Sequence, residues 1–199
     1  MKKAEIITIF DNTNFGTYLQ ALALALVIKK SGFEVEIVDY IRPGQSEEAW
    51  KRFADNFIKK IYYTFWEFPR WRKLRNGCHQ FVSHFVPSSK IRYTSYEGLK
   101  SNPPLADIYV TGSDQVWNSI YNEGIDKSFY LDFAPPGSKR VAYAASIGMP
   151  EIPEGEVEET KRLLHKYSAI TVREADASRI LAGLGFNDVP VVLDPDTIA

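Results

Sequence analysis

Residues 6–40 read IITIF-DNTNFG-TYLQALALALVIKKS-G-FEVEIVDY, and they contain one complete strand–helix–strand unit. The apolar run Ile6–Phe10 predicts a strand, and after a polar loop the Ala- and Leu-rich stretch Thr17–Ser31 predicts a helix. Gly32 ends this helix as a left-handed cap, and Val35–Tyr40 predicts the second strand. Two strands joined by one helix pair in parallel through a right-handed crossover. The chain therefore begins with a βαβ unit.

The same alternation returns in the second half of the chain. Strands are predicted over Asp107–Thr111, Lys139–Ser146, Ala169–Val172 and Pro190–Leu193, and helices over Thr94–Leu99, Gly155–Tyr167 and Glu174–Leu184. Alternating strands and helices are typical of α/β proteins with a parallel sheet. We therefore expect a Rossmann-like, doubly wound, mostly parallel sheet.

Residues 46–86 interrupt this alternation. Ser46–Trp66 and Trp71–Phe85 predict two helices with aromatic faces, which we interpret as a helical insertion within a single domain of residues 1–199. Burial of the aromatic side chains between helices is the simpler interpretation. Aromatic helices also suit peripheral contact with a membrane surface or with an acceptor molecule.

Composition excludes several classes of function. A net charge of -1 argues against nucleic acid as a partner, because phosphate binding needs a basic surplus. The single cysteine, Cys78, excludes an intrachain disulfide and favours a cytoplasmic location. The apolar run Ala21–Ile28 is far shorter than the roughly 20 residues of a transmembrane helix. No metal-ligand spacing occurs, so we expect neither a metal nor a bound cofactor.

The densest group of polar side chains follows a predicted strand. Gly112-Ser113-Asp114-Gln115-Val116-Trp117-Asn118 comes directly after Asp107–Thr111. Ligands of open α/β sheets bind beyond the carboxyl ends of the strands, and glycine allows the sharp turn that such a site needs. A helix-capping turn with Trp117 packed beneath it is an equally good interpretation of this stretch alone.

Three other strand ends offer candidate binding groups, each with a structural alternative. The loop containing Asn14 and Gly16 precedes a helix, where anions bind, but Asn14 can instead cap that helix. Small residues over 145–148 leave room for a ligand or for close packing. Arg173 can hold a phosphate or carboxylate, or it can pair with Glu174 or Asp176.

Taken together, these motifs resemble the polysaccharide pyruvyl transferase family. The resemblance rests on five stretches in the family's order: NFGTYLQALAL (14–24), GSDQVWN (112–118), YAASIG (143–148), VRE (172–174) followed by Ser178, and VLDP (192–195). The family pattern has a small residue and Thr after this proline, and Asp196-Thr197 departs slightly from it.

The resemblance implies two Rossmann-like domains facing across a cleft, as in GT-B glycosyltransferases, with this chain as the N-terminal half and a second domain downstream. It implies transfer of a pyruvyl group from phosphoenolpyruvate to two sugar hydroxyls of a cell-surface or exopolysaccharide precursor, forming a cyclic ketal. The acceptor would be a sugar or a lipid-linked oligosaccharide. Few cations lie at the predicted strand ends, so we expect most donor-binding cations and the principal acid and base in the second domain.

Within this chain, Asp114 is the candidate base or acceptor-hydroxyl ligand. The candidate substrate-binding residues are Asn14, Gly16, Gln20, Gly112, Ser113, Gln115, Trp117, Asn118, Ser146 and Arg173. Trp117 can stack on a sugar ring or pack in the core.

Two other functions remain open at this point. A GT-B glycosyltransferase that uses a nucleotide-sugar would share the fold, and binding of phosphoenolpyruvate would separate it from a pyruvyl transferase. A non-catalytic carbohydrate-binding domain would bind the acceptor and turn over nothing.

Overall fold

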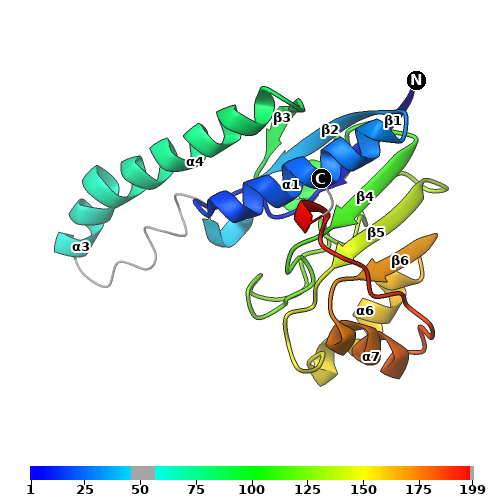
Figure 1. The fold of residues 1–199 in the computed structure, drawn as a ribbon. Helices are drawn as coiled ribbons and strands as arrows, with labels where there is room; N and C mark the ends of the chain where they lie inside the picture. Colours follow the sequence, from blue (N-terminus) through cyan, green and yellow to red (C-terminus); the bar gives the residue numbers. More distant parts are fainter. Residues whose placement is uncertain (46–56, 198–199) are drawn as a thin grey trace.

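A computed structural model describes residues 1–45 and 57–197, which form an α/β structure around one six-stranded sheet (Figure 1). The strands are β1 (Lys2–Ile7), β2 (Phe33–Tyr40), β3 (Ser88–Tyr93), β4 (Ile108–Gly112), β5 (Lys139–Ala145) and β6 (Ala169–Val172). Their order is β3-β2-β1-β4-β5-β6, and every pair is parallel. The predicted Rossmann-like, doubly wound fold is confirmed.

The helices occupy the connections between strands, except the last one, which follows β6. They are α1 (Phe15–Lys30), α3 (Phe57–Tyr62), α4 (Phe68–Ser83), α5 (Tyr96–Ser101), α6 (Val157–Leu164) and α7 (Ala175–Gly183). α1 begins where the Asn14 side chain accepts a hydrogen bond from the Gly16 N–H at 3.0 Å. Its last turn carries Lys29 and Lys30, whose positive charge suits the carboxyl end of a helix.

Each face of the sheet has its own apolar core. Ala4 and Ile6 belong to the core beneath α1, and their neighbour Ile7 belongs to the other core. Successive residues of a strand point to opposite faces, which explains this division. On the second face, the segment 113–138 between β4 and β5 consists of turns, yet it contributes the buried rings of Trp117 and Phe129.

The helical segment of residues 46–86 differs from the prediction of two separate helices. Residues 46–56 lie outside the described residues. From residue 57 onward, α3, a π-helical stretch Tyr63–Glu67 and α4 follow one another without a break. Pro69 does not end the helix because it lies in the first turn of α4, where its missing N–H is tolerated. This part of the chain leads from β2 to the edge strand β3.

The aromatic side chains at the start of this segment lie at the surface. Phe57, Phe65 and Trp66 are 76%, 67% and 64% exposed, so the expectation that they are buried between helices is wrong. Figure 1 shows that α3 and the first part of α4 extend away from the sheet. No helix in the two described ranges is long and apolar enough to cross a membrane.

Two strand predictions also need correction. Ser88–Tyr93 forms the edge strand β3, which the sequence did not indicate because it carries exposed polar residues and no apolar run. The predicted strand Pro190–Leu193 is reduced to a single bridge between Val191 and Val172. Val191 and Leu193 are exposed there, so no apolar burial favours a longer strand.

Candidate functional site

The five motifs singled out in the sequence meet at the carboxyl ends of the strands. The first turns of α1, the loops after β4, β5 and β6, and the segment around Asp194 lie next to one another and exchange hydrogen bonds. Parallel strands end at the same edge of a sheet, so topology brings together residues that are distant in sequence. We call this group of loops the carboxyl-end site.

The turn after β4 has a conformation that depends on glycine. Gly112 has φ +144°, and a Cβ atom there would lie 2.0 Å from the carbonyl oxygen of Tyr143. The next residue, Ser113, has φ +60° and donates its N–H to the same carbonyl at 3.0 Å. The Ser113 hydroxyl is buried and has no hydrogen-bond partner within the described residues. This strained turn fixes the direction in which the following residues leave the sheet.

The loops after β4 and β5 hold each other in place through their backbones. The Ser146 N–H donates to the carbonyl of Asp114 at 3.0 Å, and the Trp117 N–H donates to the carbonyl of Ser146 at 3.1 Å. Ser146 itself is buried. Its small side chain therefore serves close packing, which is one of the two interpretations that the sequence left open.

Gln115 and Asn118 join these loops through their side chains. The Asn118 amide donates to Gln115 Oε1 and to the carbonyl of Gly148, both at 3.1 Å. Gly148 has φ +60°, and a Cβ atom there would lie 2.7 Å from Gln115 Cδ. A glycine is therefore needed at this position, and the amide pair fixes the shape of the loop.

Arg173 lies at the centre of the carboxyl-end site. Its guanidinium donates to the carbonyl of Ser113 at 3.2 Å and to Glu174 at 3.3 Å, and it pairs with Asp194 at 3.6 Å. Of its two expected partners, Glu174 is present, whereas Asp176 pairs with Arg179 on α7. Arg173 thus links the second, fourth and fifth motifs.

Asp194 connects this centre to α1. Its Oδ1 accepts a hydrogen bond from the Gln20 amide at 3.2 Å. Burial raises the pKa of Asp194, and the nearby carboxylates of Asp196 and Asp114 act in the same direction, while Arg173 and Gln20 oppose them. A carboxyl group whose pKa is raised towards neutrality is suited to proton transfer.

Asp114 is half-buried beside this group. Its Oδ1 accepts the N–H of Gln115 at 2.7 Å, and its second oxygen has no hydrogen bond within the described part of the chain. Its carboxylate lies near that of Asp194, and Asp194 and Glu174 both pair with the guanidinium of Arg173. The arrangement can accept hydrogen bonds from hydroxyl groups.

Three other predicted residues make contacts that stabilise the fold itself. Asn14 and Gly16 are exposed, and their mutual hydrogen bond is the helix cap that the sequence offered as an alternative to anion binding. Trp117 is 2% exposed, stacks on Tyr130 and donates its ring N–H to the carbonyl of Phe129 at 3.4 Å. A sugar ring does not reach this side chain, so its packing interpretation fits the structure.

Several residues at the strand ends were not selected from the sequence. Asp194 and Glu174 are direct partners of Arg173, and both belong to quoted motifs, so the motifs themselves were the available signal. Asp11 and Arg42 form a buried ion pair with two contacts of 2.8 and 2.9 Å from the guanidinium. No sequence signal joins these two residues, because their contact depends on the pairing of β1 with β2.

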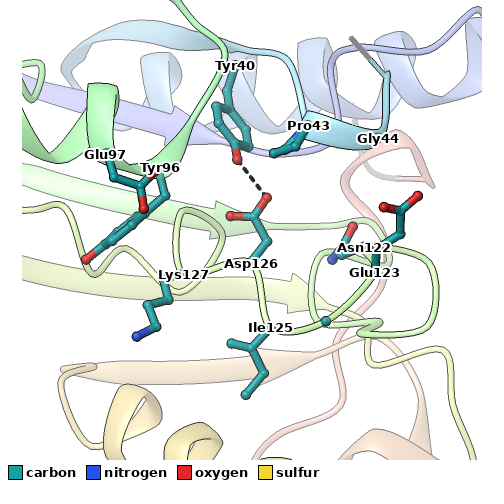
Figure 2. A pocket seen from close by; sticks show the side chains of 11 residues that line it. Tyr40, Pro43, Gly44, Tyr96, Glu97, Asn122, Glu123, Ile125, Asp126 and Lys127 are labelled. Atoms are coloured by element: carbon teal, nitrogen blue, oxygen red, sulfur yellow. Dashed lines mark hydrogen bonds between the residues drawn. The ribbon is translucent and has the colours of Figure 1, made fainter. Parts of the chain in front are cut away.

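A cavity of about 370 Å³ lies beside this pair, at the carboxyl ends of β2 and β3 (Figure 2). The Tyr40 hydroxyl points to Asp126 and donates to it at 2.8 Å. Burial raises the pKa of Asp126 despite this hydrogen bond. The lining of this cavity includes none of the residues predicted from the sequence.

Candidate metal ligands are not gathered in the described residues. Within residues 1–45 and 57–197, no three His, Cys, Asp or Glu side chains are arranged to hold a metal ion.

Comparison with known families agrees with the five motifs. The family model described as polysaccharide pyruvyl transferase matches residues 14–195, which is most of the chain. The chain belongs to this family. Its matched region begins at the Asn14 cap and ends just after Asp194, so it includes every residue that contacts Arg173 in the carboxyl-end site. Among curated proteins, none matches the chain.

Proposed function

We propose that the carboxyl-end site binds the acceptor hydroxyls of an enzyme that transfers a pyruvyl group from phosphoenolpyruvate to a sugar. The observation that carries this proposal is the pairing of Glu174 and Asp194 with Arg173, with the carboxylate of Asp114 near Asp194. Three carboxylates accept hydrogen bonds from hydroxyl groups and repel a donor that carries both a phosphate and a carboxylate. Membership of the pyruvyl transferase family supports transferase chemistry at this edge.

In the proposed reaction, two hydroxyl oxygens of the sugar bond to C2 of phosphoenolpyruvate. The C2–O bond to phosphate breaks, and the methylene carbon C3 gains a proton to become a methyl group. Of the two protons that the hydroxyls lose, one balances the gain at C3 and the other leaves with inorganic phosphate. Asp114, through its oxygen without a hydrogen bond, is our candidate to orient or deprotonate an attacking hydroxyl.

The donor needs cations, and the carboxyl-end site offers one guanidinium that carboxylates already surround. We therefore propose that a second Rossmann-like domain faces this edge and supplies the groups that hold phosphoenolpyruvate. The two domains would form a cleft like that of GT-B enzymes.

The proposed acceptor is a sugar or a lipid-linked oligosaccharide, a precursor of a cell-surface or exopolysaccharide, used in the cytoplasm. Exposed Phe57, Phe65 and Trp66 on the projecting helical segment support the lipid-linked form. Aromatic side chains on a helix are suited to the interface of a membrane.

The test is mass spectrometry of a sugar panel incubated with phosphoenolpyruvate. The protein is prepared as the 199-residue chain and with any coding sequence that follows it. We expect one pyruvyl ketal to form with the longer product. In that product, Asp114→Asn should lower kcat by about 100-fold or more, as loss of a general base does. Asp176→Asn, on the exposed face of α7, is the matched control and should leave kcat unchanged.

Two results would contradict the proposal. Sugar transfer from a nucleotide donor, without ketal formation, would instead identify a glycosyltransferase. Full activity of the Asp114→Asn enzyme would remove Asp114 from the reaction.

A further inference from the structure

A second cavity, of about 750 Å³, shares Tyr96 and Lys127 with the first and extends towards the amino ends of the strands. Arg140 is the second residue of β5, and Lys166 lies between α6 and β6, so the cavity is near the amino ends of these strands. Its lining includes five cationic side chains, which we call the basic cluster: Lys100, Lys127, Arg140, Arg162 and Lys166. Among the described residues that line it, Asp132 is the one carboxylate.

Asp132 does not neutralise this cluster. It pairs closely with Lys166, accepts the Tyr96 hydroxyl at 2.5 Å, and lies 3.9 Å from both Lys100 and Arg162. One negative charge is therefore shared among three cations.

Glu159, beside the cavity, compensates only part of the remaining positive charge. It receives two hydrogen bonds from Arg162 at 2.6 and 2.8 Å and pairs with Lys127 at 2.9 Å. These contacts, with Arg162 first, lower the pKa of Glu159 to about 2. Two carboxylates thus face five cations.

Arg140 is the cation with least compensation. Its buried guanidinium donates to four carbonyls, those of Leu131 at 3.0 Å, Ala134 at 2.7 Å, Pro135 at 3.3 Å and Ser138 at 3.5 Å. Within the described residues, no carboxylate lies within 4.0 Å of it. Buried charges in proteins are normally paired, so an excess of positive charge around a cavity indicates that an anion belongs there.

We propose that this cavity binds a diphosphate group. Phosphate oxygens accept several charge-assisted hydrogen bonds at once, and Lys and Arg are the side chains that provide them. The walls also contain Tyr96, Phe133 and Pro135, which suit an apolar or aromatic group attached to the diphosphate. A nucleoside and an isoprenyl chain both have this character. None of its lining residues belongs to the carboxyl-end site, so this proposal does not rest on the function proposed there.

The test is isothermal titration of the 199-residue chain with pyrophosphate, uridine diphosphate and farnesyl diphosphate. We expect saturable binding that falls at least about 10-fold in the double variant Lys100→Gln/Arg162→Gln. Both side chains are about half exposed, so the variant should fold. The control is Lys29→Gln/Arg179→Gln, which removes the same charge from exposed positions on α1 and α7 and should bind like the unmodified chain.

The three probes separate the possible sources of the diphosphate. Tighter binding of farnesyl diphosphate than of pyrophosphate would identify a lipid carrier, and tighter binding of uridine diphosphate would identify a nucleotide. Equal affinities would mean that the diphosphate unit alone is recognised. Absence of saturable binding by all three, or an equal loss in the control variant, would overturn the proposal.

Discussion

The two ends of the sheet differ in their charge and in what determines their local structure. At the carboxyl end, one guanidinium pairs with two carboxylates, a third carboxylate lies nearby, and two glycines with positive φ set the backbone. At the amino end, five cations line a cavity with one carboxylate, and four of these cations are on partly exposed side chains. The carboxyl end depends on backbone geometry and therefore leaves motifs in the sequence. The amino end depends on charge contributed by α5, α6, β5 and two connecting segments, and it leaves no such motif.

The largest expected effect tests the dependence on backbone geometry. Gly112→Ala places a Cβ atom 2.0 Å from a backbone oxygen at φ +144°, so the turn after β4 must deform. We expect a loss of about 4 kcal/mol in the free energy of unfolding. Urea denaturation followed by circular dichroism measures it.

Gly183→Ala is the matched control for this variant. Gly183 is the last residue of α7, and a Cβ atom there would meet nothing within 4 Å. Alanine favours a helix over glycine, so stability should stay constant or rise by up to about 1 kcal/mol. Equal losses of unfolding free energy in the two glycine variants would show that the turn after β4 does not require glycine.

The second test compares one arginine from each end. Arg42→Met leaves Asp11 buried without its partner and should cost about 3 kcal/mol of stability. Arg162→Met removes a half-exposed arginine from the basic cluster and should cost about 1 kcal/mol or less. Thermal denaturation of both variants measures the difference. A larger loss for Arg162 would mean that the amino end also stabilises the fold.

The smallest expected effect concerns a charge inside the sheet, away from both ends. Burial raises the pKa of Glu5 on β1 to about 8, against the opposing influence of Lys3. The folded chain therefore keeps this proton while the unfolded chain releases it near pH 4.5. Stability should fall as pH rises between about 4.5 and about 8.

Urea denaturation at pH 5 and pH 8 checks this dependence. Glu5→Gln should remove most of the difference between the two conditions. Glu34→Gln, at an exposed position of β2, should retain it. An unchanged pH dependence in Glu5→Gln would assign the effect to another group.

The sequence predicted those parts of the fold that depend on local patterns. α1, β2, β4 and β6 follow from apolar runs, a polar cap and glycines within short windows. β1 begins at Lys2, four residues before the predicted Ile6–Phe10, and ends at Ile7. β3 was missed because an exposed edge strand gains little from apolar residues and carries none of that signal. The continuity through Pro69 was missed because proline usually ends a helix, whereas here it lies in the first turn of α4 and is tolerated.

The sequence indicated which residues belong to the carboxyl-end site, but not which of them contact one another. Motif order selected Gln20, Asp114 and Arg173, but the convergence of Gln20 and Arg173 on Asp194 depends on strand pairing. Whether Trp117 faced a ligand or the core was likewise undecidable from spacing. Its position follows from Tyr130, which the turn-rich segment after β4 brings against its ring.

The place of β1 in the middle of the sheet has a consequence for how the chain is made. Ala4 lies opposite Val35 on one side and opposite Ile108 on the other. As the chain emerges from the ribosome, β1 and β2 can pair around α1 early, whereas the other side of β1 stays uncovered until residue 108 has appeared. An uncovered strand edge is a template for pairing with another chain. The nascent protein is therefore most prone to aggregation while residues 41–107 are being synthesised.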